Sequence, residues 1–144
     1  MTATTGLGYR FNLGYSPTTT KQRFNMKDAA VCGVLIVNAT DTSNLTLNEC
    51  NAASSGTEQT LAVITQYWTQ ASATAATAWT RVTQAAASTV PTISAGLTYF
   101  EVSAVSMSDG FTYLDASHAN AKMVFILNGL NVRRAPAALA SAIA

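Results

Sequence analysis

The chain has 144 residues, of which 49% are hydrophobic and only 10% are charged, whereas ordinary soluble domains carry about 25% charged residues. Ala, Thr and Ser fill the deficit with 26, 21 and 12 copies. This composition excludes a highly charged disordered chain, disfavours a typical solvent-exposed enzyme, and fits one domain with a single core. We expect a surface of small neutral side chains that packs against neighbours.

The few charges are distributed unevenly. Residues 1–27 carry four cations and no acid, and residues 28–115 carry all seven acids with Arg81 as the single cation. Residues 116–144 carry Lys122, Arg133 and Arg134. Basic flanks around an acidic middle predict docking on an acidic surface. Nucleic acid is disfavoured as a partner, because four charges spread over this first segment supply few phosphate contacts.

Residues 1–28 are predicted to form an extended basic arm, because their glycines, Pro17 and a Thr run disfavour a helix. Aromatic and apolar residues alternate between positions 9 and 15, which is typical of a strand. The stripe either adds to the sheet of a neighbouring protein or forms the first edge strand of the domain's own sheet. If it is an arm, its deletion leaves a folded domain. The partner-docking residues that we expect on the two flanks are Arg10, Lys21, Arg23, Lys27, Tyr9, Phe11, Tyr15, Arg133 and Arg134.

Residues 29–134 are predicted to form the main domain. Residues 29–38 are apolar on both faces and pair with residues 45–50 as a hairpin. Further strands are expected at 79–84, 97–107, 111–116 and 122–128, and the last strand is again apolar on both faces. Residues 58–70 are ambiguous, because Leu61, Ile64 and Trp68 fit a helical face, but their Thr residues favour a strand at 58–65 with a loop at 66–78. Seven to eight short strands with turn signals predict an all-β fold, an antiparallel β-sandwich or barrel. Residues 135–144 form an Ala-rich tail, in which Leu139 and Ile143 suit a short docking helix.

Residues suited to chemistry are scarce. His118 is the only histidine, and a general base needs an orienting partner and a nucleophile. Asp109 and Asp115 lack the ligand density of a calcium site. Cys32 and Cys50 are too few for a disulfide scaffold or a zinc site, and we expect reduced thiols. The sequence therefore predicts no enzyme, no cofactor and no metal. The longest apolar run, 29–37, is too short to span a bilayer, and no signal peptide is recognisable.

Strand and turn patterns between residues 30 and 136 resemble a known group of proteins. They include the aromatic strand of Gly110, Phe111 and Tyr113, a final apolar strand, and an ending with Arg134 and Pro136. The segments that carry the resemblance are 34–37, 45–52, 56–57, 61–68, 79–84, 99–102, 110–114, 124–127 and 133–136. Their order resembles small virion proteins of tailed bacteriophages, taken for capsid decoration or cement proteins.

The resemblance implies a structural virion protein, made in the cytoplasm of a host bacterium and bound to the outer capsid surface across capsomer joints. Its partners would be the major capsid protein and copies of itself, with a trimer favoured and a dimer open. No membrane is implied. Two alternatives remain. One is another virion part, such as a tail-tube, head–tail joining or shell protein. The other is a module that binds carbohydrate or a host surface through Tyr67, Trp68, Trp79 and Tyr113, although core packing is favoured for these rings.

Overall fold

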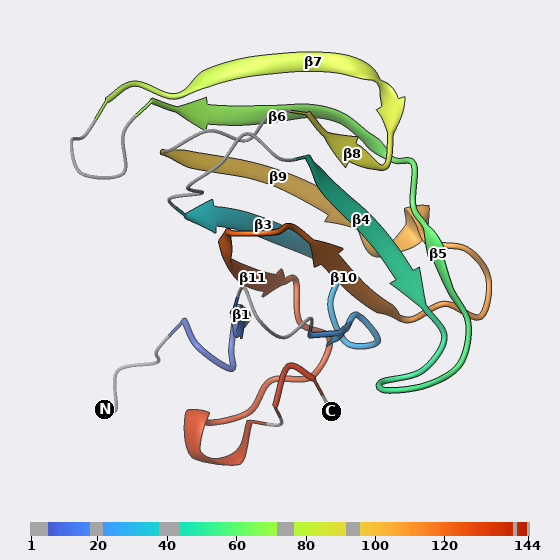
Figure 1. The fold of residues 1–144 in the computed structure, drawn as a ribbon. Helices are drawn as coiled ribbons and strands as arrows, with labels where there is room; N and C mark the ends of the chain where they lie inside the picture. The colour runs from blue at the N-terminus through green and yellow to red at the C-terminus, as the bar shows by residue number, and fades with distance from the viewer. Residues whose placement is uncertain are drawn as a thin grey trace.

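Two antiparallel sheets face each other and form a β-sandwich (Figure 1). The computed structural model describes residues 6–17, 22–37, 44–71, 77–91, 96–139 and 141–143. The six-stranded sheet consists, in spatial order, of β1 (Phe11–Ser16), β11 (Lys122–Asn128), β3 (Val31–Val37), β9 (Leu97–Ser103), β6 (Ile64–Gln70) and β7 (Thr80–Ala87). The five-stranded sheet consists of β2 (Phe24–Asn25), β10 (Tyr113–Ser117), β4 (Leu45–Cys50) and β5 (Glu58–Thr60), with β8 (Thr89–Val90) paired to β4. The predicted antiparallel β-sandwich is confirmed, with eleven strands in the described residues instead of seven or eight.

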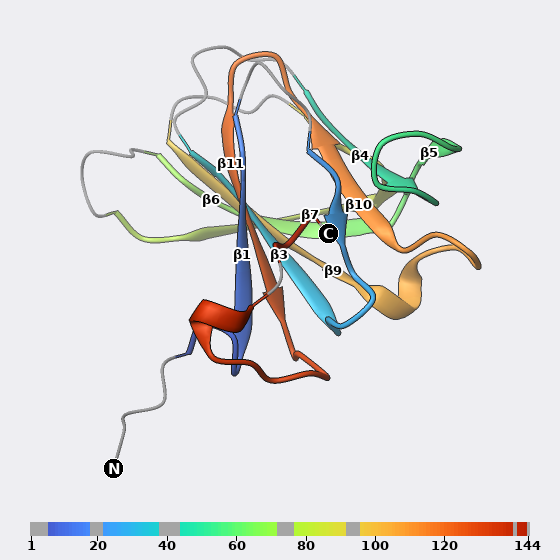
Figure 2. The same cartoon turned by 90° about the horizontal axis from the view of Figure 1, so that it is seen from below.

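The core fills the space between the sheets, which Figure 2 shows as two layers. Phe24 of β2 and Phe125 of β11 stack across this space with ring centroids 4.1 Å apart and planes inclined by 19°. Phe100 and Leu114 are also fully buried. Each such side chain contributes about 1.5–3 kcal/mol through its removal from water. Phe100 and Val102 share the core face of β9, as their spacing predicts.

The N-terminal segment is part of the sandwich, so the prediction of a separate arm over residues 1–28 is wrong for its described residues. β1 pairs with β11 from Phe11↔Asn128 to Ser16↔Met123, and forms an edge of the domain's own sheet. β2 pairs with β10 and places Phe24 in the core. The physical reason is apolar burial: the ring of Phe24 lies directly over Gly14, where a Cβ would come within 2.0 Å of it.

The predicted hairpin between residues 29–38 and 45–50 is also wrong. β3 and β4 lie in different sheets. Both edges of β3 are occupied, by β11 and β9, while β4 pairs with β10 and β5. Hydrophobic runs identify strands but carry no information about their partners, so the crossover was missed.

Three element boundaries also differ from expectation. The strand predicted at 58–65 is split into β5 and β6, because Leu61 turns into the core between them. β6 runs on to Gln70, through the segment expected to be a loop. The strand predicted at 97–107 ends at Ser103 and continues as a single 3-10 turn, η1 (Ala104–Ser106).

The described residues of the tail contain a second short 3-10 turn, η2 (Pro136–Ala138), in place of a docking helix. It still contacts the domain: the Asn25 N–H donates to the Ala142 carbonyl over 2.8 Å, and Ala142 is buried.

Candidate functional site

The two basic flanks meet at one end of the sandwich, where the turn before β1 contacts the segment after β11. The Arg134 N–H donates to the Gly8 carbonyl over 2.9 Å. Gly8 has φ of +81°, and a Cβ at this position would come within 2.2 Å of the Arg134 carbonyl oxygen. This close backbone approach requires a glycine, and it places Arg10 and Arg133 on neighbouring segments.

The turn between β2 and β3 joins the same end. The Asn131 N–H donates to the Asp28 carbonyl over 2.9 Å, and the Ala30 N–H donates to the Asn128 carbonyl over 2.9 Å. Lys27 therefore lies beside the segment after β11. We define the basic end as Arg10, Lys27, Arg133 and Arg134, all of which are exposed. Asp28 is the exposed acid beside them.

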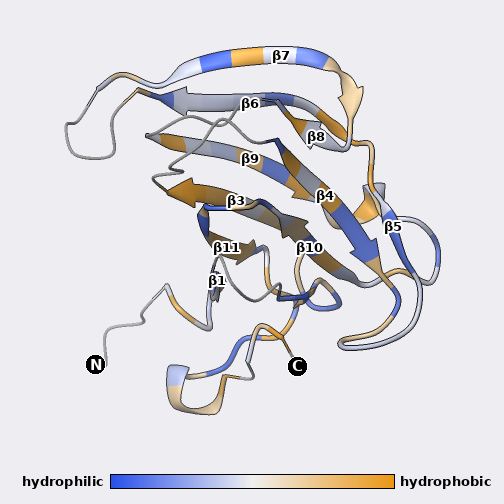
Figure 3. Cartoon of the chain, viewed as in Figure 1, coloured by the Kyte–Doolittle hydropathy of each residue, from blue (hydrophilic) through white to orange (hydrophobic). Residues whose placement is uncertain are grey.

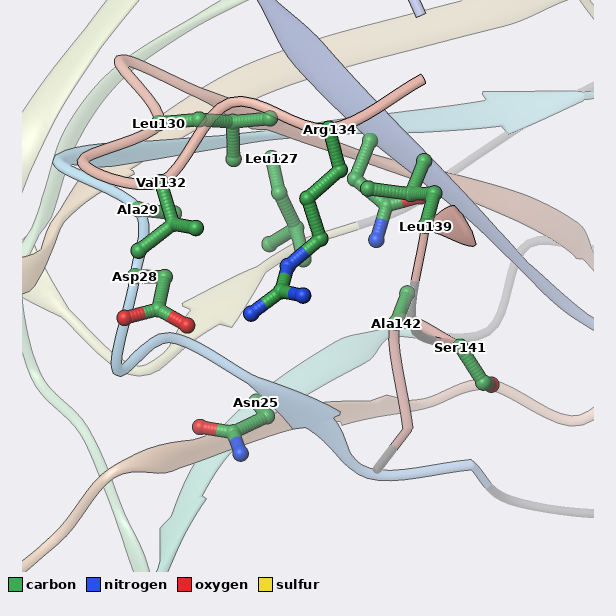
Figure 4. Close-up of a pocket in the computed structure, with 11 residues that line it drawn as sticks. Asn25, Asp28, Ala29, Leu127, Leu130, Val132, Arg134, Leu139, Ser141 and Ala142 are labelled. Carbon is green, nitrogen blue, oxygen red and sulfur yellow. The ribbon is translucent and has the colours of Figure 1, made fainter. Parts of the chain in front are cut away.

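A small pocket opens within the basic end, between β2, the end of β11 and the tail (Figure 4). Its volume is about 70 Å³. The Arg134 guanidinium points into it, on the side of Asp28 and Asn25, and Leu127 and Leu139 form apolar walls. A pocket of this size holds a few atoms at most, so it suits the tip of a partner's side chain and not a cofactor.

Arg23, which the sequence predicts as a docking residue, lies apart from the basic end and is held by partners within the chain. Its Nη1 donates to the carbonyls of Ala52 and Ser55 over 2.9 and 3.0 Å. Its Nη2 forms an ion pair of 2.9 Å with Glu58, and its Nε lies 3.7 Å from the buried Asp115 carboxylate. Through these contacts, Arg23 holds the loop after β4 against the five-stranded sheet.

The other predicted docking residues are dispersed. Tyr9 and Phe11 are half-buried near the basic end, and the ring of Phe11 lies under Gly6. Tyr15 is 54% exposed at the far end of β1, on the outward face of the six-stranded sheet. Lys21 lies outside the described residues.

Cys50, Glu58 and Asp115 are the one metal-like group among the described residues, with ligand atoms within 4.8 Å of one another. The Cys50 thiol donates to Asp115 over 3.2 Å, and Asn48 donates to the other Asp115 oxygen over 3.1 Å. Burial, followed by the Asp115 carboxylate, raises the pKa of Cys50 to about 12. The thiol is therefore protonated at neutral pH, and the Arg23 guanidinium already supplies the positive charge.

The residues considered for catalysis are not brought together. His118 is buried, and its Nδ1 accepts from the Asn120 N–H over 3.1 Å. Asp109 is exposed in a turn, whereas Asp115 faces Arg23. Cys32 is buried and free, with a pKa raised by burial.

A shallow aromatic depression of about 420 Å³ lies on the outward face of the six-stranded sheet, lined by Trp68, Trp79, Tyr99 and Glu101. Trp68 and Tyr99 are cross-strand partners with ring centroids 6.3 Å apart, and the Tyr99 hydroxyl donates to Glu101 over 2.8 Å. Sequence reasoning selected the two tryptophans but missed Tyr99 and Glu101, although their spacing of two on one strand indicates a shared face. Tyr67 is in the core, as expected, whereas the core packing favoured for Trp79 is wrong, because this ring is 46% exposed.

In comparisons with known proteins, no family model, curated protein or solved structure matches the chain. Within the described ranges, none of the helices has the length and apolar character needed to cross a membrane.

Proposed function

We propose that this chain is a structural virion protein of a tailed bacteriophage, which binds the outer surface of the capsid across capsomer joints and stabilises the shell. The resemblance in sequence pattern suggests the role of a decoration or cement protein. The major capsid protein is then the partner, and the basic end is the attachment surface.

The observation that carries the proposal is the convergence of Arg10, Lys27, Arg133 and Arg134 from three separate segments. Cations that are far apart in the sequence become one patch, with Asp28 as the exposed acid beside it. Such a patch suits a broad acidic surface, because complementary charge steers association and fixes orientation. The surroundings of His118, Cys50 and Asp115 support binding without catalysis.

The proposal is tested by co-sedimentation with shells assembled from the major capsid protein of the same phage genome. Arg10→Glu and Arg133→Glu are each expected to weaken attachment by about tenfold or more, because they place like charges against an acidic surface. Arg81→Glu is the matched control, with the same change in net charge on β7, and should bind within about twofold of the parent. Attachment should also weaken as ionic strength rises.

Three outcomes contradict this function. One is attachment that ignores salt and both charge reversals, and another is failure to sediment with shells. The third is tighter binding to duplex DNA than to shells in a mobility-shift assay, which would assign the basic end to nucleic acid.

A second candidate, carbohydrate binding at a host surface, is favoured by the aromatic depression. Trp68 and Trp79 offer planar faces on which sugar rings stack, and Glu101 offers a hydrogen-bond acceptor. Titration with bacterial surface oligosaccharides, followed by tryptophan fluorescence, tests it. Binding should disappear in Trp79→Ala and persist in Tyr15→Ala, and a signal that survives Trp79→Ala contradicts this site.

A further inference from the structure

The outward face of the six-stranded sheet is apolar across most of its width. Because paired residues of antiparallel strands share a face, the register places the same alternate residues of every strand on this side. The apolar members are Phe11, Leu13, Tyr15, Val124, Ile126, Val31, Leu35, Val37, Leu97, Tyr99 and Trp68. One continuous row crosses five strands, from Tyr15 through Val124, Leu35 and Tyr99 to Trp68. We call this surface the outer face.

The outer face differs from the solvated side of an ordinary sandwich. A sheet with one wet face shows alternating apolar and polar residues, and strands covered on both faces read as continuous apolar runs. β3 and β11 are such runs, as Figure 3 shows along β3. Yet within the described residues no strand or helix covers the outer face, and Leu13 and Tyr15 are 46% and 54% exposed.

The size of the outer face suits a pair of proteins. Six strands at about 4.8 Å spacing and seven residues at about 3.3 Å rise span roughly 24 by 23 Å. Two such faces bury about 1,100 Å² together, which exceeds the approximately 1,000 Å² expected of a specific interface. Near the centre of the face, the Tyr99 ring fills the space above Gly33.

Two charged residues of the outer face, Lys122 and Glu101, are complementary to each other, whereas Arg81 lies apart from them beside Trp68 on the edge strand β7. Lys122 lies on β11, on one side of β3, and pairs with Val37, which is two residues after Leu35. Glu101 lies on β9, on the other side of β3, and pairs with Gly33, which is two residues before Leu35. Lys122 and Glu101 are therefore equidistant from Leu35. When two copies stack face to face, a two-fold axis can lie above Leu35, parallel to the sheet and perpendicular to the line from Lys122 to Glu101. This axis brings Lys122 of each copy onto Glu101 of the other and produces two identical ion pairs.

We propose that the outer face is a self-association surface, on which a second copy of this chain packs to form a two-fold symmetric pair centred on Leu35. Aromatic and aliphatic side chains form the dry centre, and the Lys122–Glu101 pairs at the rim fix the register. This inference stands independently of the capsid, because it concerns a face distinct from the basic end. It implies a dimer where the resemblance favours a trimer.

The mass of the full chain in solution tests the pair, measured by sedimentation velocity at up to about 100 μM, since interfaces of this size reach micromolar affinity. The parent should sediment at twice its 15.1 kDa mass. Leu13→Lys introduces a charge at an exposed position of the face and should raise the dissociation constant by about tenfold or more. Val105→Lys is the matched control, because Val105 is 93% exposed on η1 and lies off the face.

Charge exchange provides the decisive comparison, because Lys122 and Glu101 are exposed. Glu101→Lys removes one exposed hydrogen bond from the Tyr99 hydroxyl, so the fold should be retained. Lys122→Glu should weaken the dimer by placing two carboxylates together. Adding Glu101→Lys in the same chain should restore it, because both ion pairs re-form with reversed polarity. A monomeric or trimeric parent overturns the proposal, and so does a dimer that is insensitive to both Leu13→Lys and Lys122→Glu. None of these measurements involves shells, so they fail or succeed separately from the attachment test.

Discussion

Truncation of Phe24 is the sharpest test of whether the N-terminal segment belongs to the core. The ring is fully buried and stacks on Phe125. Phe→Ala substitutions at such sites lower the free energy of unfolding by about 3–5 kcal/mol, through lost burial and the cavity left behind. The loss of the stacked ring pair adds to this cost and favours the upper part of the range. We expect Phe24→Ala to lower the free energy of unfolding by about 4 kcal/mol. A domain of this size has roughly 7–20 kcal/mol in total, so the variant should still fold.

Gly14→Ala examines the same contact from the opposite side. The added Cβ would come within 2.0 Å of the Phe24 ring, and such overpacking typically destabilises by about 1–3 kcal/mol. When Phe24 is already Ala, the space above Gly14 is empty and the second substitution should be nearly neutral. The two effects are therefore non-additive, with a coupling of about 1 kcal/mol or more.

The assay is urea unfolding of all four proteins of the cycle, followed by Trp68 and Trp79 fluorescence and by circular dichroism. With a urea dependence of about 2 kcal/mol per molar, Phe24→Ala should lower the midpoint by roughly 2 M. A change below about 0.5 kcal/mol in both single variants, together with strict additivity, would refute the reasoning and return residues 1–28 to the role of an arm.

Three further predictions concern the framework. Deleting residues 1–28 should abolish cooperative thermal unfolding in circular dichroism, because β1 and β2 are lost; a retained transition would contradict their integral role. Arg23→Met should destabilise by about 2–4 kcal/mol, because it leaves the buried Asp115 without its cation, and Arg23→Lys should not fully rescue; equal stability of both with the parent argues against the ion pair. The pKa of Cys50 is raised to about 12 from an ordinary value of about 9, so this thiol should leave stability unchanged below pH 8 and lower it by up to about 1.4 kcal/mol per pH unit above pH 9. The buried Cys32 thiol, whose pKa is also raised, adds its own decline in the same range, so Cys50→Ser should make the slope shallower without removing it, and an unchanged slope in urea titrations refutes the assignment.

The sequence predicted the kind of elements better than their pairing. The apolar residues of β3 and β11, and the alternation of Phe100 and Val102, identify strands because burial imposes a period of two on one face. The partners of a strand depend on contacts between distant residues, so the β3–β4 hairpin was mispredicted. Phe24 was overlooked because a two-residue strand has no measurable periodicity.

For the candidate site, too, the sequence identified residues but not the contacts between them. Arg10, Lys27, Arg133 and Arg134 were selected from the charge distribution, yet only the register of β1 on β11 brings the two flanks together. Arg23 carries the same charge in the same segment but is held by Glu58, and composition cannot separate a paired cation from an exposed one. Strands that are apolar on both faces are typical of a fully buried sheet, whereas in β3 and β11 one of those faces points outward.

The place of β3 in the sheet also governs when the protein can fold during synthesis. Val37 pairs with Leu97 on one side and with Lys122 on the other, so neither neighbour exists when β3 leaves the ribosome. Translation proceeds at about 5–20 residues per second, and β3, the most apolar of the described strands, therefore waits several seconds with both edges open. Sheets that depend on such distant pairings form slowly and are prone to aggregate until they close. Lower temperature or a holding chaperone should accordingly raise the yield of folded protein.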